Sequence, residues 1–311
     1  MRILIVGGSG DVGEHLAKDF SNQGQDVTIL DRAEIATEMK ERPRVRFLKG
    51  DITDKTFVTE AVRNQEVVLH LAWSFSDNAQ TIFEEDIKGH LHLLEAASAK
   101  GIRRFIYAST ATVYGKAVVH PVTEDHPCLL MESRKPSYAL GKYAAEELCR
   151  LYHRERNLPA TIFRFWWAFG EKIGGRHLRD LIKKAMNHQT IEMVQGAGGT
   201  FLTMSDLGRA IGCAIGNPAA SGQVYNVGSL FLTWEEIGAR IIDLTRSTSS
   251  IHLIHSDQWK GPAFLNEVWD LSWEKAKREI GFDPLESPEQ MQLLFSQALR
   301  DCIAQVKKEE K

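Results

Sequence analysis

A tyrosine and a lysine lie four residues apart in the segment PSYALGKYAAEEL, which spans residues 136–148. Pro136 and the alanines and leucines after it predict a helix, on which Tyr138 and Lys142 share a face. A tyrosine with its usual pKa of about 10 is a poor acid or base at neutral pH. An ammonium about 4 Å away favours the phenolate by on the order of 4 kcal/mol at an effective dielectric of about 20. The pair therefore predicts a general acid/base.

A hydroxyl group that could assist this pair lies upstream, in the segment YASTATVYG. Ser109 and Thr110 follow a predicted strand, where a hydroxyl could hydrogen-bond the oxygen of a reacting alcohol or carbonyl. By themselves, a tyrosine and a lysine at this spacing are more often a half-buried aromatic beside a surface charge. Thr110, together with the loop described next, favours the catalytic interpretation.

A glycine-rich loop, VGGSGDVG, stands between the first predicted strand and a predicted helix. Gly7, Gly10 and Gly13 permit a tight turn, close approach of backbone N–H groups to a pyrophosphate, and close packing of helix on strand. Asp31 ends the next predicted strand, where its carboxylate could accept hydrogen bonds from a ribose 2′-hydroxyl and would repel a 2′-phosphate. The loop and Asp31 predict NAD in preference to NADP, although Arg32 could tolerate the phosphate.

The elements that must position these residues follow a regular alternation. Helical patterns separate short apolar runs, which predicts a parallel sheet covered on both faces, a doubly wound Rossmann-like α/β domain over residues 1–167. Over residues 168–311 glycine-rich loops, amphipathic helices and isolated strands such as QVYNVG predict a smaller α+β substrate domain, partly interleaved with the first. Its last helix starts after Ser287, with Leu293, Leu294, Ala298 and Cys302 on an apolar face. The predicted strands of the first domain are RILIVGG, DVTILDR, VRFLKGD, VVLHLAW, RFIYAST and ATIFRFWW.

Composition narrows the classes of function. The chain has 311 residues, 43% hydrophobic and 25% charged, and lacks the roughly 18 to 20 consecutive apolar residues of a membrane span. A net charge of −3 with mixed signs disfavours a nucleic-acid binder. The N-terminus reads as a strand and not as a signal peptide, and the four cysteines form no CxxC pair. We expect a cytoplasmic protein with a small-molecule substrate, no metal site and no membrane contact.

The sequence resembles the extended short-chain dehydrogenase/reductase family, the NAD-dependent epimerase/dehydratase group, over nearly the whole chain. The motifs that carry the resemblance are GxxGxxG, GDITD, HLAW, STATVYG, YxxxK, RFWWAFG, TMSDLGRAI and YNVG. The resemblance implies that Thr110 takes the catalytic Ser/Thr position, that Tyr138 is the acid/base, and that Lys142 lowers its pKa and holds the nicotinamide ribose. It also implies that Asp51 and Ile52 contact the adenine and that the backbone of Leu71 and Ala72 lies beside the cofactor. The predicted cofactor-binding residues are Gly7, Gly10, Asp11, Val12, Gly13, Asp31, Arg32, Asp51, Ile52, Leu71, Ala72, Tyr138 and Lys142.

Three positions depart from the pattern of sugar-nucleotide relatives. Trp167 stands where RPxNVYG has an asparagine that contacts the nucleotide sugar, and Gly199 where an arginine commonly grips the diphosphate. Asp86 replaces the asparagine that usually starts a helix. Trp73, Trp166 and Trp167, with Thr110, are therefore candidate substrate residues in an apolar pocket, although each indole could equally belong to the core.

The leading interpretation is an NAD-dependent oxidoreductase that acts on a secondary alcohol or ketone through Tyr138, Lys142 and Thr110. One alternative is a nucleotide-sugar epimerase or dehydratase with tightly held NAD, which the missing asparagine and arginine disfavour. The other is a non-catalytic NAD-binding sensor, which would need only the glycine loop and Asp31. Similar proteins pair the helix of Tyr138 with the helix near residues 83–100 in a dimeric four-helix bundle, so we expect a homodimer that covers the stripe of Leu140.

Overall fold

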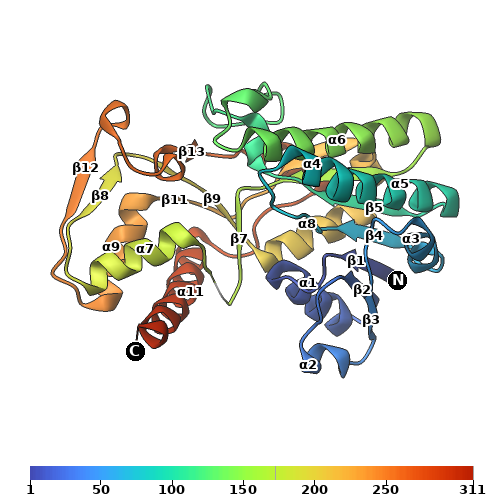
Figure 1. The fold of residues 1–311 in the computed structure, drawn as a ribbon, viewed down its shortest axis with the longest axis horizontal. Coiled ribbons are helices and arrows are strands. Elements are labelled where there is room, and N and C mark those ends of the chain that lie inside the picture. Colours follow the sequence, from blue (N-terminus) through green and yellow to red (C-terminus); the bar gives the residue numbers. More distant parts are fainter. Residues whose placement is uncertain (172, 311) are drawn as a thin grey trace.

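Seven parallel strands form the central sheet of the computed structural model, which describes residues 1–171 and 173–310 (Figure 1). The spatial order is β10-β6-β5-β4-β1-β2-β3, and each neighbouring pair runs parallel. The strands therefore run outward from β1 in both directions, which makes the sheet doubly wound and confirms the predicted Rossmann-like fold. The strands are β1 (Arg2–Val6), β2 (Asp26–Asp31), β3 (Val45–Lys49), β4 (Val67–His70), β5 (Arg104–Ala108), β6 (Ala160–Arg164) and β10 (Gln223–Asn226).

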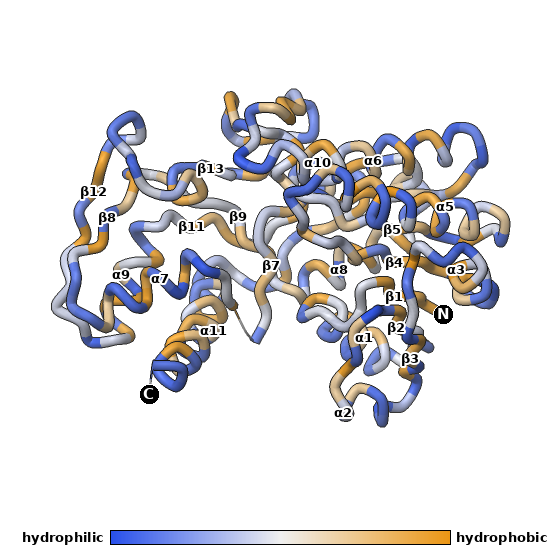
Figure 2. Tube along the Cα trace, viewed as in Figure 1, coloured by the Kyte–Doolittle hydropathy of each residue, from blue (hydrophilic) through white to orange (hydrophobic). Residues whose placement is uncertain are grey.

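Helices cover both faces of this sheet. Ile3 and Ile5 of β1 belong to one hydrophobic cluster, whereas Leu4 and Val6 belong to the other. Because both faces are buried, the strands read as continuous apolar runs, which Figure 2 shows in orange along β1, β4 and β5. The first cluster is completed by α1 (Asp11–Asn22), α8 (Met204–Gly216) and α10 (Glu274–Ile280), and the second by α3 (Lys55–Val62), α5 (Lys88–Lys100) and α6 (Pro136–Arg156).

The helical segment between β4 and β5 begins earlier than predicted and is not uniform. It opens with α4 (Ala79–Thr81), continues as a π-helical stretch (Ile82–Ile87) and ends as α5. Asn78 caps its N-terminus, because its side chain accepts a hydrogen bond from the backbone N–H of Thr81 at 3.3 Å. π-Helical turns occur frequently at functional sites, and this one carries the buried Asp86.

Much of the chain after β6 forms a second lobe, at the left in Figure 1, whereas α8, β10 and α10 return to the central sheet. QVYNVG does not belong to it as an isolated strand, because it contains β10, which pairs with β6 at the edge of the central sheet. The division of the chain after residue 167 stays a prediction. The remaining elements are α2 (Thr37–Lys40) in the first half, and β7 (Trp167–Phe169), α7 (Arg176–Met186), β8 (Ile191–Val194), β9 (Gly198–Thr203), β11 (Leu230–Thr233), α9 (Trp234–Thr245), β12 (Ile251–Ile254), β13 (Val268–Trp269) and α11 (Pro288–Glu309).

The last helix, α11, starts where it was predicted to start. The Ser287 hydroxyl accepts a hydrogen bond from the backbone N–H of Gln290 at 3.3 Å. Its buried face includes the predicted Ala298 and Cys302, whereas Leu293 and Leu294, which were predicted on the same face, are exposed. The residues that α11 buries are Met291, Phe295, Ala298, Leu299, Cys302, Ile303 and Val306. Within residues 1–171 and 173–310, none of the helices is long and apolar enough to cross a membrane.

Candidate active site

A cavity of about 470 Å³ opens at the carboxyl ends of β1, β2 and β4. Such an edge is where ligands bind in open α/β sheets. The structure brings together here all the predicted cofactor residues other than Tyr138 and Lys142. It adds Trp73, which was predicted as a substrate residue, and several residues that the sequence did not indicate. The lining residues are Val6, Gly7, Gly10, Asp11, Val12, Gly13, Leu30, Asp31, Arg32, Gly50, Asp51, Ile52, Leu71, Ala72, Trp73, Ser74, Phe75, Glu85 and Asp86.

The glycine loop is shaped for a phosphate group. Gly7 has φ +82°, and a Cβ atom there would lie 2.4 Å from the backbone nitrogen of Ala72, so only glycine fits. The loop leads into the N-terminus of α1, where free N–H groups and the helix dipole favour an anion. The pyrophosphate of a dinucleotide fits this arrangement, and these residues would hold it.

Asp31, the last residue of β2, lines the cavity. The Asp31 carboxylate accepts hydrogen bonds from the backbone N–H groups of Ser9 and Ala33, each at 3.0 Å. Arg32 is engaged elsewhere, since its guanidinium donates to Glu85 at 2.9 Å and lies 3.6 Å from Asp51. The guanidinium is thus neutralised by two carboxylates, which favours NAD over NADP.

Replacement of Asp31 by asparagine is expected to weaken NAD binding by about tenfold and to reduce the preference for NAD over NADP. The variant keeps an acceptor oxygen but loses the charge that strengthens a hydrogen bond to the ribose and repels a 2′-phosphate. Titration calorimetry with both cofactors would measure the effect. Glu34→Gln is the matched control, because that exposed carboxylate pairs with Lys40 and Lys49 outside the cavity. An unchanged ratio of the two affinities in Asp31→Asn would contradict the prediction.

Tyr138 and Thr110 lie together at the start of α6. The Tyr138 ring is 9% exposed, and burial raises the pKa of its phenol, while a hydrogen bond with the Thr110 hydroxyl opposes this rise. Thr110 follows β5 and caps a short 3₁₀ turn, since its oxygen accepts a hydrogen bond from the Thr112 backbone N–H at 3.2 Å. The turn therefore fixes the hydroxyl beside the phenol.

Lys142 lies one turn along α6 in an aromatic setting. Its ammonium donates to the Ala108 carbonyl at 2.9 Å and sits 4.2 Å from the centre of the Trp73 ring and 4.9 Å from that of Tyr107. Burial lowers the pKa of Lys142 to about 7. In this arrangement the pKa of Tyr138 is raised and not lowered, because desolvation outweighs the charges around the phenol. The expected lowering by Lys142 is therefore not present in this arrangement of the side chains.

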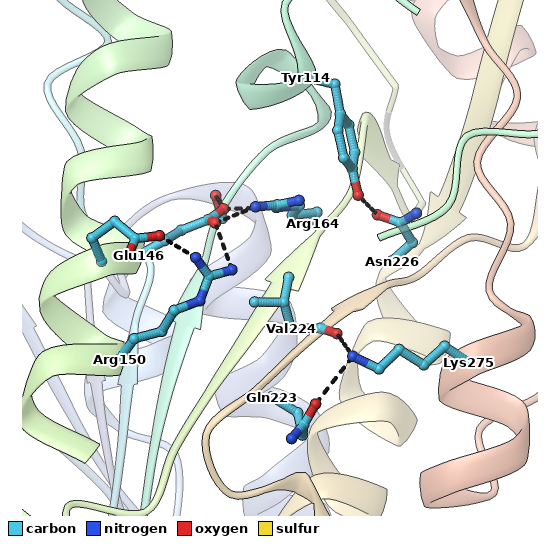
Figure 3. Close-up of polar contacts among 10 residues, drawn as sticks. Tyr114, Glu146, Arg150, Arg164, Gln223, Val224, Asn226 and Lys275 are labelled. Carbon is cyan, nitrogen blue, oxygen red and sulfur yellow. Dashed lines mark hydrogen bonds and ion pairs between the residues drawn. The ribbon is translucent and has the colours of Figure 1, made fainter. Parts of the chain in front are cut away.

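A buried ion pair behind these residues was not found from the sequence. Figure 3 shows Glu146 of α6 with Arg164 of β6, which it contacts through two hydrogen bonds of 2.9 and 2.5 Å. Ser109 also donates to Glu146, so the network joins α6 to β5 and β6 directly beside Thr110. A signal existed, because a glutamate four residues after Lys142 extends the buried face of the helix. The network fixes the register between Thr110 and the helix that carries Tyr138.

Trp166 and Trp167 lie apart from the cofactor cavity. They are half-buried in an aromatic cluster of the C-terminal lobe, and Trp166 stacks on Phe264 with ring centres 5.4 Å apart. A Cβ atom at Gly199 would lie 2.3 Å from the Trp166 ring, so the residue in place of the expected arginine is small because an indole covers it. Trp166 also meets Phe201 and Trp234 edge-on. The structure thus gives both indoles packing partners, and their contact with substrate stays a prediction.

The chain is similar to known proteins over its whole length. It is 30% identical to a UDP-N-acetyl-alpha-D-glucosaminuronate decarboxylase of Bacillus cytotoxicus, over 80% of this chain and 82% of the relative. The solved UDP-glucuronic acid 4-epimerase of Bacillus cereus, in complex with NAD, has the same fold with a TM-score of 0.79, 23% identity and full coverage of both chains.

A dTDP-glucose 4,6-dehydratase of Streptomyces venezuelae, solved with NAD bound, also shares the fold, with a TM-score of 0.77 and 22% identity over 99% of this chain and 97% of that chain. The model of the NAD dependent epimerase/dehydratase family matches residues 3–228. Those residues include the glycine loop, Asp31, Thr110, Tyr138 and Lys142. The chain therefore belongs to the NAD dependent epimerase/dehydratase family.

Proposed function

We propose that the protein is an NAD-dependent oxidoreductase that interconverts a secondary alcohol and a ketone at Tyr138. One observation carries the proposal: the lining of the cavity that fits NAD includes Trp73 and Phe75, whose rings contact the ring of Tyr138. An acid/base with a neighbouring hydroxyl, that of Thr110, is therefore next to the space for the cofactor. A sensor would not need these groups.

Tyr138, Thr110 and Lys142 have different roles in the reaction. In the oxidation direction the Tyr138 phenolate takes the hydroxyl proton, and the Thr110 hydroxyl orients the substrate oxygen. Bound NAD would supply the acceptor for the hydride of the carbinol carbon, so that the alcohol would become a ketone. Lys142, one turn along α6 from Tyr138, would hold the nicotinamide ribose of bound NAD, the second role that the resemblance implies for it. In the reduction direction the phenol returns its proton to the carbonyl oxygen.

An epimerase or dehydratase acting on a nucleotide sugar is the second candidate, and the relatives named above favour it. Such an enzyme uses the same acid/base but recovers its NAD within each turnover. The departures at Trp167 and Gly199 argue against it. The first position is itself an indole, and the second is covered by the Trp166 indole, and neither ring can pair with a diphosphate. We therefore prefer a substrate with apolar groups and net turnover of the cofactor.

The experiment that tests the proposal measures the nicotinamide content of the freshly purified protein, released by denaturation and identified by mass spectrometry. A dehydrogenase must exchange its cofactor, so we expect a largely empty site that binds added NAD reversibly and reduces it with secondary alcohols. Near-stoichiometric NAD, together with turnover of UDP- or dTDP-sugars and no net NADH, would replace the proposal by the second candidate.

The homodimer also belongs to the proposal. Leu140 on α6 is 41% exposed and Phe83 on the π-helical stretch is 47% exposed, while Ala144 and Leu151 are half-buried. Three of these apolar side chains lie on α6, and Phe83 lies on the neighbouring π-helical stretch. A second copy of the chain would cover them, as the predicted four-helix bundle requires.

A further inference from the structure

Phe75 is a large apolar side chain in an unusual position. It lies in the loop between β4 and α4, is 67% exposed, and has a left-handed backbone conformation with φ +55°. A bulky residue adopts this conformation only at a cost, which is commonly found at functional sites. Its ring stacks on the ring of Tyr138, with centres 5.9 Å apart and planes 17° apart. An exposed phenylalanine is therefore held against the proposed acid/base.

The loop is anchored on both sides of Phe75. The buried carboxylate of Asp86 accepts hydrogen bonds from the backbone N–H and the hydroxyl of Ser74, at 2.8 and 2.6 Å. The same hydroxyl accepts a hydrogen bond from the backbone N–H of Ser76 at 3.2 Å. Asp77 forms an ion pair of 3.1 Å with Lys135, which immediately precedes α6. The π-helical stretch and the start of α6 thus hold Phe75, which lies between the two anchors, in place.

The neighbouring aromatic residue cannot present a free face in the same way. Trp73 is 9% exposed, meets the Tyr138 ring edge-on, and has the Lys142 ammonium over its own face. Phe75 has one face against Tyr138 and is otherwise largely exposed beside the cofactor cavity. Of the two rings, only that of Phe75 is available to a ligand whose oxygen reaches the phenol.

We propose that Phe75 determines substrate specificity by stacking on an aromatic ring next to the carbinol carbon of the substrate. The inference rests on the proposed function and names its substrate class: aryl-substituted secondary alcohols and the corresponding aryl ketones. When the substrate oxygen binds Tyr138 and Thr110, the substituent on the carbinol carbon lies next to the phenol. The Phe75 ring, which stacks on the Tyr138 ring, extends the apolar surface there. Stacked aromatic pairs add to the gain from apolar burial alone.

The test compares 1-phenylethanol with 2-butanol as substrates, with NAD, for the wild-type protein and its variants. Phe75→Ala is expected to lower kcat/KM for 1-phenylethanol about tenfold more than for 2-butanol. The ratio of the two alcohols removes any general effect on Tyr138. Phe75→Tyr is expected to keep the wild-type ratio, whereas Phe75→Asn, which tolerates positive φ but has no ring, should behave like the alanine variant.

Leu293→Ala is the matched control, because that side chain is 63% exposed on α11, away from the loop. It should leave both substrates unaffected. An unchanged ratio in Phe75→Ala, or a wild-type ratio in Phe75→Asn, would overturn the inference and leave the proposed function standing. If the wild-type protein oxidises neither alcohol, the proposed function fails and the inference fails with it.

Discussion

Tyr138→Phe is expected to abolish turnover, with a fall in kcat/KM of about a thousandfold, while the protein stays folded. The substitution removes one oxygen atom and keeps the ring that contacts Trp73 and Phe75. Proton transfer by a positioned side chain contributes about 10²- to 10⁴-fold to a rate. Initial rates with a secondary alcohol and NAD would measure the loss, and calorimetry would show that NAD binding is kept.

Tyr143→Phe is the control for this experiment, because Tyr143 is a half-buried tyrosine on the same helix. It should retain wild-type turnover. Burial raises the pKa of Tyr138, so oxidation, which needs the phenolate, should accelerate as the pH rises above neutral. Reduction, which needs the phenol, should not accelerate. A Tyr138→Phe protein with wild-type turnover would exclude the proposed mechanism.

The sequence was sufficient for those parts of the molecule that depend on local patterns. Strands β1, β2, β4, β5 and β6 are largely buried on both faces, so each leaves a mainly apolar run that distinguishes it from the helices, whereas β3 at the sheet edge is only half-buried. Gly7 and Asp31 were recognised because a turn and a strand end fix them within one strand-helix-strand unit. The assignment of β10 failed, since its partner β6 lies some sixty residues earlier and the local pattern carries no information on pairing.

Packing decided the features that were not predicted. Leu293 and Leu294 are both apolar, yet α11 turns Phe295 and Leu299 toward the core in their place, beside the predicted Ala298 and Cys302. Phe75 is positioned through its neighbour Ser74, which donates two hydrogen bonds to Asp86, twelve residues along the chain, and by a backbone conformation that no pattern of residue types indicates. The setting of Lys142 depends on Trp73, which comes from another strand end.

Lys142 should also change how the free energy of unfolding depends on pH. Its pKa falls from 10.5 to about 7 on folding because the ammonium is buried, so the folded state releases this proton at a lower pH than the unfolded state. Between pH 7 and about 10.5 the unfolded chain therefore binds more protons, and this residue makes stability rise with pH. Below pH 7 the buried charge imposes its full cost, of the order of 5 kcal/mol for this shift.

Lys142→Met is accordingly expected to lose activity and to flatten the pH dependence of stability. Relative to the variant, the wild-type protein should gain about 4 kcal/mol in the free energy of unfolding from pH 6 to pH 10, as measured by urea unfolding at both values. Lys88→Met, which removes an exposed lysine on α5, should follow the wild-type curve. Parallel curves for Lys142→Met and wild type would mean that the ammonium is solvated. Divergent curves, with activity lost, would mean that the protein tolerates a destabilising buried charge because catalysis requires it.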